Sequence, residues 1–102
     1  NIKLDEKEQI YIFRIIQELM NNIIKHSNAT EAQIKIFDDN DTLNIFVKDN
    51  GMGFDSSLNK SGNGLKNILE RTKLLNGNIL INSIINQGTT IQISIPVQYG
   101  KN

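Results

Sequence analysis

Two residues in the first quarter of the chain have the chemical types and the spacing of a metal or water site. Glu18 and Asn22 are four residues apart, so they lie on successive turns of one helix face. A carboxylate and an amide oxygen are hard ligands for a divalent cation, and both can also orient water. A solvated helix face is the ordinary explanation of such a polar stripe, but Asn21 and Asn22 are poor helix formers that cap nothing in mid-helix. The stripe also contains Arg14, Lys25 and His26.

A carboxylate followed by glycines stands at Asp49. It ends a predicted apolar strand, and Gly51 and Gly53 come directly after it. Such a strand end can accept a hydrogen bond from a flat polar ligand, while the glycines let the ligand lie against bare backbone. An ordinary type I′ turn at Asn50-Gly51 is the alternative, but Gly53 and the absence of an immediate return strand argue against it.

Two further glycine motifs are weak by themselves. Gly62 and Gly64 lead into a predicted helix that begins at Leu65, and amides freed by glycine at a helix N-terminus suit a phosphate. Gly88 and Thr89 stand where a hairpin turn is a sufficient explanation. The sequence lacks the glycine-rich loop with Lys and Ser or Thr of P-loop nucleotide-binding proteins.

The longest predicted helix, residues 5–27, positions the first of these groups. Asp5 is predicted to cap it, and Glu6 and Glu8 suit its positive first turn. At about 100° per residue, one broad apolar face is expected to turn toward the core. This face consists of Ile12, Ile16, Leu19, Met20 and Ile23.

Strands and a second helix follow. Residues 31–37 and 42–48 alternate around an Asp- and Asn-rich turn, which predicts a β-hairpin half buried against the helix. The inward side chains are expected to be Ala32, Ile34, Ile36, Leu43, Ile45 and Val47. A long loop, 49–64, precedes a helix at 65–76 that Gly77 is expected to stop. The last two strands are expected at 78–85 and 89–97. This order predicts an α+β fold with helices on one face of a largely antiparallel sheet.

The composition restricts the possible functions. With 102 residues, the chain is predicted to be a single domain, residues 1–102. Lys and Arg number 11, as do Asp and Glu, so bulk charge favours neither nucleic acid nor an anionic membrane. The absence of cysteine and the single histidine exclude thiolate and multi-histidine metal sites.

The ends of the chain lead to further expectations. No apolar run is long enough to span a membrane and no signal peptide is visible, so a cytoplasmic location is expected. The chain opens at Asn1 without an initiator Met, and we expect a domain from a longer protein. Residues 1–4 are expected to be a truncated first strand, and residues 98–102 a frayed tail.

Taken in order along the chain, these motifs resemble the catalytic, ATP-binding domain of a sensor histidine kinase. The motifs are Glu18-x-x-x-Asn22 with Lys25-His26, Asp49-x-Gly51-x-Gly53, Gly62-x-Gly64-Leu65 and Gly88-Thr89. The segment RIIQELMNNIIKHSNAT is most similar to the nitrate-sensor and degradation-sensor subgroup. The resemblance implies the Bergerat fold, a two-layer α/β sandwich in which helices cover one face of a largely antiparallel mixed sheet. It also implies a short glycine-rich ATP lid, here residues 54–63.

The resemblance implies a role for each motif residue. Asn22 would give its side-chain oxygen to a Mg²⁺ ion that bridges the ATP phosphates, and Glu18 would act at the γ-phosphate. Asp49 would accept a hydrogen bond from the adenine amino group. The remaining residues implied in ATP binding are Lys25 and His26 near the phosphates, Gly51 and Gly53 along the base, Gly62, Gly64 and Leu65 at the lid, and Thr89 behind the adenine.

The resemblance also implies partners. A protein histidine kinase transfers the γ-phosphate to a histidine on a separate dimerisation and phosphoacceptor domain, and a response regulator receives it next. His26 belongs to the asparagine-box helix, so the isolated fragment is expected to be a monomer that binds ATP and autophosphorylates poorly. No nucleic acid and no direct membrane contact are expected for this domain, whether or not the parent protein is membrane-anchored. The alternatives are an anti-sigma-factor-type serine kinase, a hydrolytic ATPase in which Glu18 activates water, and a degenerate nucleotide-sensing or interaction module.

Overall fold

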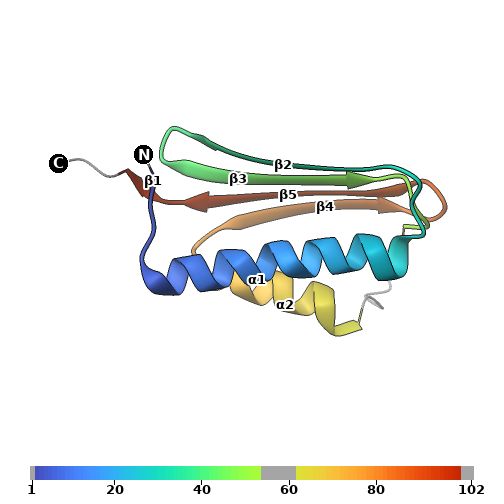
Figure 1. The fold of residues 1–102 in the computed structure, drawn as a ribbon, viewed down its shortest axis with the longest axis horizontal. Coiled ribbons are helices and arrows are strands. Elements are labelled where there is room, and N and C mark those ends of the chain that lie inside the picture. The colour runs from blue at the N-terminus through green and yellow to red at the C-terminus, as the bar shows by residue number, and fades with distance from the viewer. Residues whose placement is uncertain (1, 54–61, 100–102) are drawn as a thin grey trace.

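The computed structural model describes residues 2–53 and 62–99. Its strands are β1 (Ile2–Lys3), β2 (Ala32–Asp39), β3 (Thr42–Asp49), β4 (Asn78–Ile84), β5 (Gly88–Pro96) and β6 (Gln98–Tyr99). The main sheet has the order β2-β3-β5-β4, and every pairing among the described strands is antiparallel. Two helices pack on one face of this sheet (Figure 1). The predicted α+β architecture is therefore confirmed.

The first helix, α1 (Glu6–Asn22), begins at a complete capping box. Glu8 N donates to Asp5 Oδ1 at 2.7 Å, and Asp5 N donates to Glu8 Oε1 at 2.8 Å, which satisfies amides that the helix itself leaves unpaired. The helix then continues as a π-helical turn, η1 (Ile23–Ser27), and ends at Asn28 in the left-handed conformation with φ 57°. The predicted helical segment is confirmed, with a change of helix type that the sequence did not indicate.

The core-facing side of α1 is rotated relative to the prediction. Ile12, Ile15 and Leu19 are buried, whereas Met20 is 45% exposed, so the inward placement predicted for Met20 is wrong. Met20 lies about 100° further round the helix than Leu19, beyond the arc that the sheet and the second helix cover. Ile15, which the prediction left out, is fully buried.

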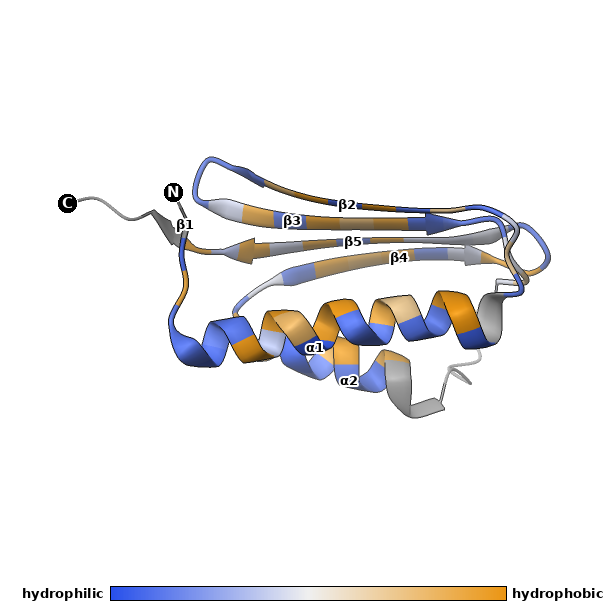
Figure 2. Cartoon of the chain, viewed as in Figure 1, coloured by the Kyte–Doolittle hydropathy of each residue, from blue (hydrophilic) through white to orange (hydrophobic). Residues whose placement is uncertain are grey.

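The sheet contributes the other half of the core through strict alternation. Burial alternates along β3, and its buried side chains lie beside those of their partners on β5. Apolar segments run through the middle of both strands (Figure 2). The buried apolar residues of these two strands are Leu43, Ile45, Val47, Ile91, Ile93 and Ile95. β2 shows no alternation in burial, because all eight of its residues are exposed. Ile34 and Ile36 lie on the predicted face, beside their partners Val47 and Ile45, but they are 37% and 49% exposed because β2 is an edge strand.

The turns have specific backbone geometries. The β2–β3 turn places Asn40 and Asp41 at φ 50° and 65°, the two left-handed residues of a type I′ hairpin. The second helix, α2 (Gly62–Leu74), begins three residues earlier than predicted. The left-handed residue after it is Asn76, with φ 60°, and Gly77 N donates to Thr72 O at 2.9 Å.

The two ends of the described chain pair with each other. Ile2 is opposite Tyr99 and Lys3 is opposite Gln98 in the short β1–β6 ladder, so the prediction of fraying is wrong for Gln98 and Tyr99. This ladder lies at one end of the molecule, beyond the N-terminal end of α1 (Figure 1). None of the helices in residues 2–53 and 62–99 is both long and apolar enough to cross a membrane.

Candidate functional site

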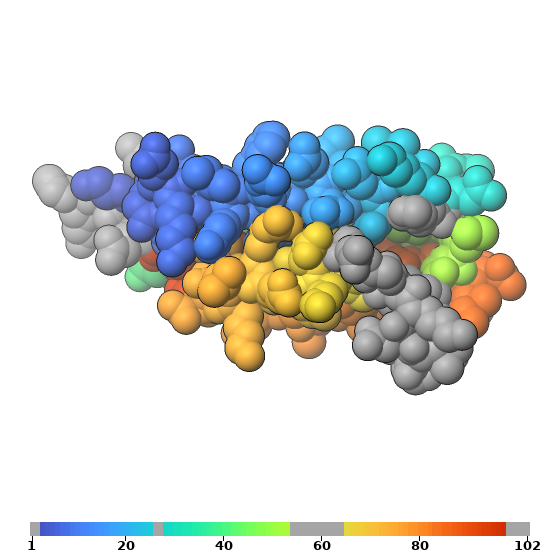
Figure 3. Space-filling view, turned by 90° about the horizontal axis from the view of Figure 1, so that it is seen from below, coloured from blue at the N-terminus to red at the C-terminus, as the bar shows by residue number. Residues whose placement is uncertain are grey.

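Elements that carry the predicted site residues converge at the end of the molecule away from the chain termini. The C-terminal end of α1, the C-terminal end of β3, the N-terminal end of α2 and the β4–β5 turn all lie toward this end (Figure 1). Seen from the helical side, α1 and α2 lie side by side over the sheet (Figure 3). Asn22, Asp49 and Gly62 therefore belong to elements that end in the same region.

Asp49 is the most distinctive side chain of this region. It is 8% exposed and lies on the helix-facing side of β3, in alternation with the buried Leu43, Ile45 and Val47. The amide of Gly51 donates to Asp49 Oδ1 at 2.8 Å. Burial of a carboxylate is costly unless its oxygens are hydrogen-bonded, so the position is suited to a ligand that donates to it.

Asp49 belongs to a row of three polar residues across the sheet, which we term the polar rung: Asp49, Thr89 and Ser83. These residues are successive partners in the β3–β5 and β5–β4 ladders. Ser83 Oγ and Thr89 Oγ1 are 2.7 Å apart and share a hydrogen bond. The sequence motifs include Asp49 and Thr89 but not Ser83. The signal was present, because Ser83 continues the inward alternation of Ile79 and Ile81 along β4.

Two glycines keep backbone segments close together around the polar rung. Gly88 has φ 120°, and a Cβ on it would overlap the carbonyl oxygen of Asp49. Gly53 has φ 64°, and a Cβ there would overlap the carbonyl oxygen of Ile84. Asn86 N also donates to Met52 O, which joins the segment after β3 to the β4–β5 turn. Close contact between backbone segments therefore requires glycine at both positions, whether or not a ligand binds there.

The helix side of the region contains the other predicted residues. Glu18 is half-buried on α1, and Asn22 is its last residue, half-buried with a side chain that does not cap the following turn. Lys25 is exposed in η1, and the backbone of His26 lies in the same turn, while its side chain is outside the described part. Because a π turn bonds each residue to the fifth along, Lys25 does not follow Asn22 with the α-helical rotation assumed from the sequence.

The second glycine motif lies inside a helix and not in the loop where the sequence placed it. Gly62 and Gly64 belong to the first turn of α2, and Leu65 is 8% exposed in the next position. The amides of a first helical turn have no partner within the helix, so this end of α2 keeps its predicted capacity for an anion. The proposed lid at 54–63 lies outside the described residues up to position 61.

Metal binding by side chains alone has no support in residues 2–53 and 62–99. They contain no group of three or more His, Cys, Asp or Glu residues placed to hold an ion. Mg²⁺ commonly takes most of its ligands from a bound molecule or water.

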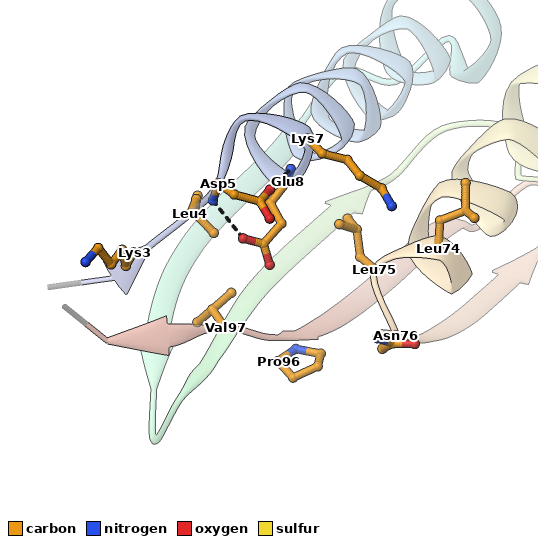
Figure 4. Close-up of a pocket in the computed structure, with 10 residues that line it drawn as sticks. All are labelled: Lys3, Leu4, Asp5, Lys7, Glu8, Leu74, Leu75, Asn76, Pro96 and Val97. Atoms are coloured by element: carbon orange, nitrogen blue, oxygen red, sulfur yellow. Dashed lines mark hydrogen bonds between the residues drawn. The ribbon is translucent and has the colours of Figure 1, made fainter. Parts of the chain in front are cut away.

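A cavity of about 590 Å³ lies at the end of the molecule opposite the candidate site (Figure 4). It is lined by the N-terminal end of α1, the residues that end α2, and Pro96 and Val97. Its two carboxylates, Asp5 and Glu8, form the capping box of α1. These residues stabilise the helix start, and we do not assign the cavity a function.

Comparisons with known proteins agree with this arrangement. Residues 7–99 match the family described as histidine kinase-, DNA gyrase B- and HSP90-like ATPase. The chain is 38% identical over 96 residues to the signal transduction histidine-protein kinase/phosphatase DegS of Brevibacillus brevis, covering 93% of this chain and 25% of that protein. It is 34% identical over 99 residues to the sensor protein VraS of Staphylococcus aureus, covering 95% of this chain and 28% of that protein. The chain thus spans about a quarter of the length of these relatives.

Solved structures show the same fold at lower sequence identity. The Acinetobacter baumannii histidine kinase AdeS superposes with a TM-score of 0.76 at 19% identity, covering 90% of this chain and 48% of that one. The histidine kinase domain of the Erythrobacter litoralis EL346 blue-light activated histidine kinase gives a TM-score of 0.73 at 19% identity, covering 85% and 43%. On the match that extends over nearly its whole length, the chain belongs to the histidine kinase-, DNA gyrase B- and HSP90-like ATPase family.

Proposed function

We propose that residues 1–102 form the ATP-binding catalytic domain of a sensor histidine kinase. The domain transfers the γ-phosphate of Mg-ATP to a histidine on a separate dimerisation and phosphoacceptor domain. The observation that carries this proposal is the buried carboxylate of Asp49 at the end of β3, in a chain whose family match covers residues 7–99. The names of DegS and VraS, a histidine-protein kinase and a sensor protein, favour this function over the other activities in the family.

The base of ATP is proposed to bind at the polar rung. Asp49 accepts a hydrogen bond from the adenine amino group through the carboxylate oxygen that does not receive the Gly51 amide. Gly51 and Gly53 line the base, and Thr89 lies behind it. This assignment is supported by the burial of Asp49 and by the glycine geometry of this segment.

The phosphates are proposed to extend toward α1 and α2. Asn22 gives its side-chain oxygen to the Mg²⁺ ion, which, when bound, neutralises phosphate charge. One protein ligand fits the absence of a three-residue acidic or histidine cluster in the described part of the chain. Glu18 orients the reacting groups at the γ-phosphate. The residues assigned to the phosphates themselves are Lys25, His26 and the first turn of α2 with Gly62, Gly64 and Leu65.

The partners follow from the proposed reaction. The acceptor histidine belongs to a helical dimerisation domain, and a response regulator takes the phosphoryl group from it. The 102-residue chain by itself is proposed to be monomeric and cytoplasmic, to bind ATP, and to phosphorylate itself poorly. No nucleic acid or membrane takes part in the reaction.

Calorimetry with a non-hydrolysable ATP analogue tests nucleotide binding. We expect Mg²⁺-dependent binding that Asp49→Asn weakens at least about tenfold, because a hydrogen bond to a charged acceptor is lost. Asn22→Ala should weaken binding by about three- to tenfold with Mg²⁺ present and have little effect without it. Asp39→Asn, which alters an exposed carboxylate of β2, is the matched control and should bind normally. Absence of binding to the wild-type chain at millimolar Mg-ATP would leave only the degenerate module.

Phosphoryl transfer needs a second experiment. The chain is mixed with labelled ATP and with the helical dimerisation and phosphoacceptor domain that is its proposed partner. Acid-labile phosphate on that domain is the expected product. Acid-stable label on serine of a partner protein would instead favour the anti-sigma-type kinase. Release of inorganic phosphate without labelled protein would favour the hydrolytic ATPase.

A further inference from the structure

The side chain of Asn50 connects two segments that are 20 residues apart in the sequence. Its Oδ1 accepts from the backbone amides of Thr30 and Glu31, each at 3.0 Å. Its Nδ2 donates to Thr30 Oγ1, also at 3.0 Å. The backbone amide of Asn50 adds a fourth bond, to Glu31 O at 3.2 Å. Both lone pairs of the amide oxygen are thus used within the protein.

These two segments lead to different parts of the candidate nucleotide site. Asn50 stands between Asp49, proposed to bind adenine, and Gly51. Thr30 and Glu31 follow η1 after the left-handed turn at Asn28 and lead into β2. Asn50 therefore ties the base side of the site to the chain that leaves the helix of Asn22.

The base side is held in place by contacts that do not involve the Asn50 side chain. Asp49 is in register with Thr89 in the β3–β5 ladder, and the Gly51 amide donates to its carboxylate. The carbonyl of Met52 accepts from Asn86. Loss of the Asn50 side chain would therefore leave the base pocket in place and remove three of the four hydrogen bonds that join Asn50 to Thr30 and Glu31.

We propose that Asn50 is a positioning residue that fixes the separation between the adenine carboxylate and the metal-binding amide. This inference rests on the proposed function, and it concerns a ligand that must reach both sides of the site at once. Positioning of reacting groups accounts for most of the catalysis in phosphoryl transfer, so a small change in this separation is costly. The affinity of a ligand that contacts only the base side does not depend on this separation.

The test compares two ligands by calorimetry on the 102-residue chain, Mg-ATP analogue and adenosine. Asn50→Ala should weaken Mg-ATP binding about tenfold or more and change adenosine binding by less than about threefold. Asn44→Ala is the matched control: this asparagine lies in β3, on the face opposite that of Asp49, and accepts a hydrogen bond from Ser94 at 3.2 Å. The Asn44→Ala variant should bind both ligands with the affinity of the wild type.

Asn50→Asp supplies the rescue variant. It keeps both acceptor positions for the amides of Thr30 and Glu31 and loses only the donor to Thr30 Oγ1. Measured at an ionic strength of about 0.3 M, where exposed charges are screened, it should recover most of the Mg-ATP affinity. If Asn50→Ala does not fold, Asn50→Ser takes its place, since a hydroxyl is too short for all three bonds but leaves the backbone unchanged.

The outcomes separate the possible failures. Suppose that the wild-type chain binds Mg-ATP. If Asn50→Ala then loses affinity equally for Mg-ATP and adenosine, or loses none for either, the positioning role is overturned and the proposed function stays intact. A wild-type chain that binds no Mg-ATP would overturn the proposed function and this inference together. A selective loss for Mg-ATP that Asn50→Asp reverses supports it.

Discussion

The hydroxyl groups of Ser83 and Thr89 lie 2.7 Å apart across the β4–β5 ladder, at the rung where Thr89 is also the partner of Asp49. Two residues earlier along β3, on the same face, the corresponding positions are Ile81, Ile91 and Val47. The inward face of the sheet thus changes from apolar to polar within one repeat of the alternation. Because Ser83 shares its hydrogen bond with Thr89, it restricts the direction in which the Thr89 hydroxyl can donate.

The first prediction concerns this pair. Ser83→Ala should weaken binding of the Mg-ATP analogue by about two- to tenfold, the range expected for loss of one hydrogen bond in the site. Calorimetry measures the effect. Ser94→Ala removes a serine of β5 that is hydrogen-bonded to Asn44 on the opposite face, and it should leave affinity unchanged. Equal effects of the two substitutions would show that Ser83 has no specific role.

Gly88 gives a prediction about folding stability. Gly88→Ala should lower the free energy of unfolding by at least about 2 kcal/mol, because a non-glycine residue at φ 120° is strained and its Cβ would overlap the Asp49 carbonyl oxygen. Urea denaturation followed by circular dichroism measures this. Gln87→Ala changes the exposed neighbour and should stay within about 0.5 kcal/mol of the wild type. A Gly88→Ala protein of wild-type stability would be incompatible with the described backbone.

Thr72 offers a stabilising substitution. It is 1% exposed on α2, and its hydroxyl oxygen has no hydrogen-bond partner within the described residues. Thr72→Val keeps the shape and removes the unpaired hydroxyl, so the unfolding free energy should rise by about 1 kcal/mol and Tm by about 4–8 °C. Thr90→Val, at a half-buried site in β5, is the comparison and should change Tm by less. A fall in Tm for Thr72→Val would mean that its hydroxyl is paired in solution.

The exposed edge strand predicts aggregation of the isolated chain. Ile36 is 49% exposed on β2, which has no partner strand on its outer edge among the described residues. Ile36→Lys should slow the growth of light scattering at high protein concentration, since a charge on an edge strand opposes pairing with another chain. Phe13→Lys removes an even more exposed side chain, 63%, but from the middle of α1, where backbone groups bond within the helix. A larger benefit from Phe13→Lys would point to general surface hydrophobicity instead.

The sequence predicted most of this architecture because its local signals agree with one another. Asp5 was predicted to cap α1, and the structure adds the reciprocal bond to Glu8. The alternation of Leu43, Ile45 and Val47 specified both strand and face. Asp49 was found by its position directly after that alternation. Its inward direction follows from the same two-residue period.

The predictions that failed depended on tertiary position. The periodicity of α1 could not distinguish Ile15 from Met20, because its apolar arc is wider than the surface that covers it. Ile34 and Ile36 alternate as well as any residues of β3, but strand order places them at an edge, and a sequence pattern does not contain strand order. The alternation of β4 put Ser83 on the inward face, but its place beside Thr89 depends on strand pairing, which the sequence pattern does not contain.

The polar rung continues the same ladder that builds the core, and this restricts how the gene can change. Deleting or inserting one codon within β3 would turn Asp49 to the opposite side and, in the same event, expose Ile45 and Val47. Ligand recognition and folding would then be lost together. Evolutionary change in strand length should therefore occur in steps of two residues or be confined to hairpin ends such as Asn40-Asp41.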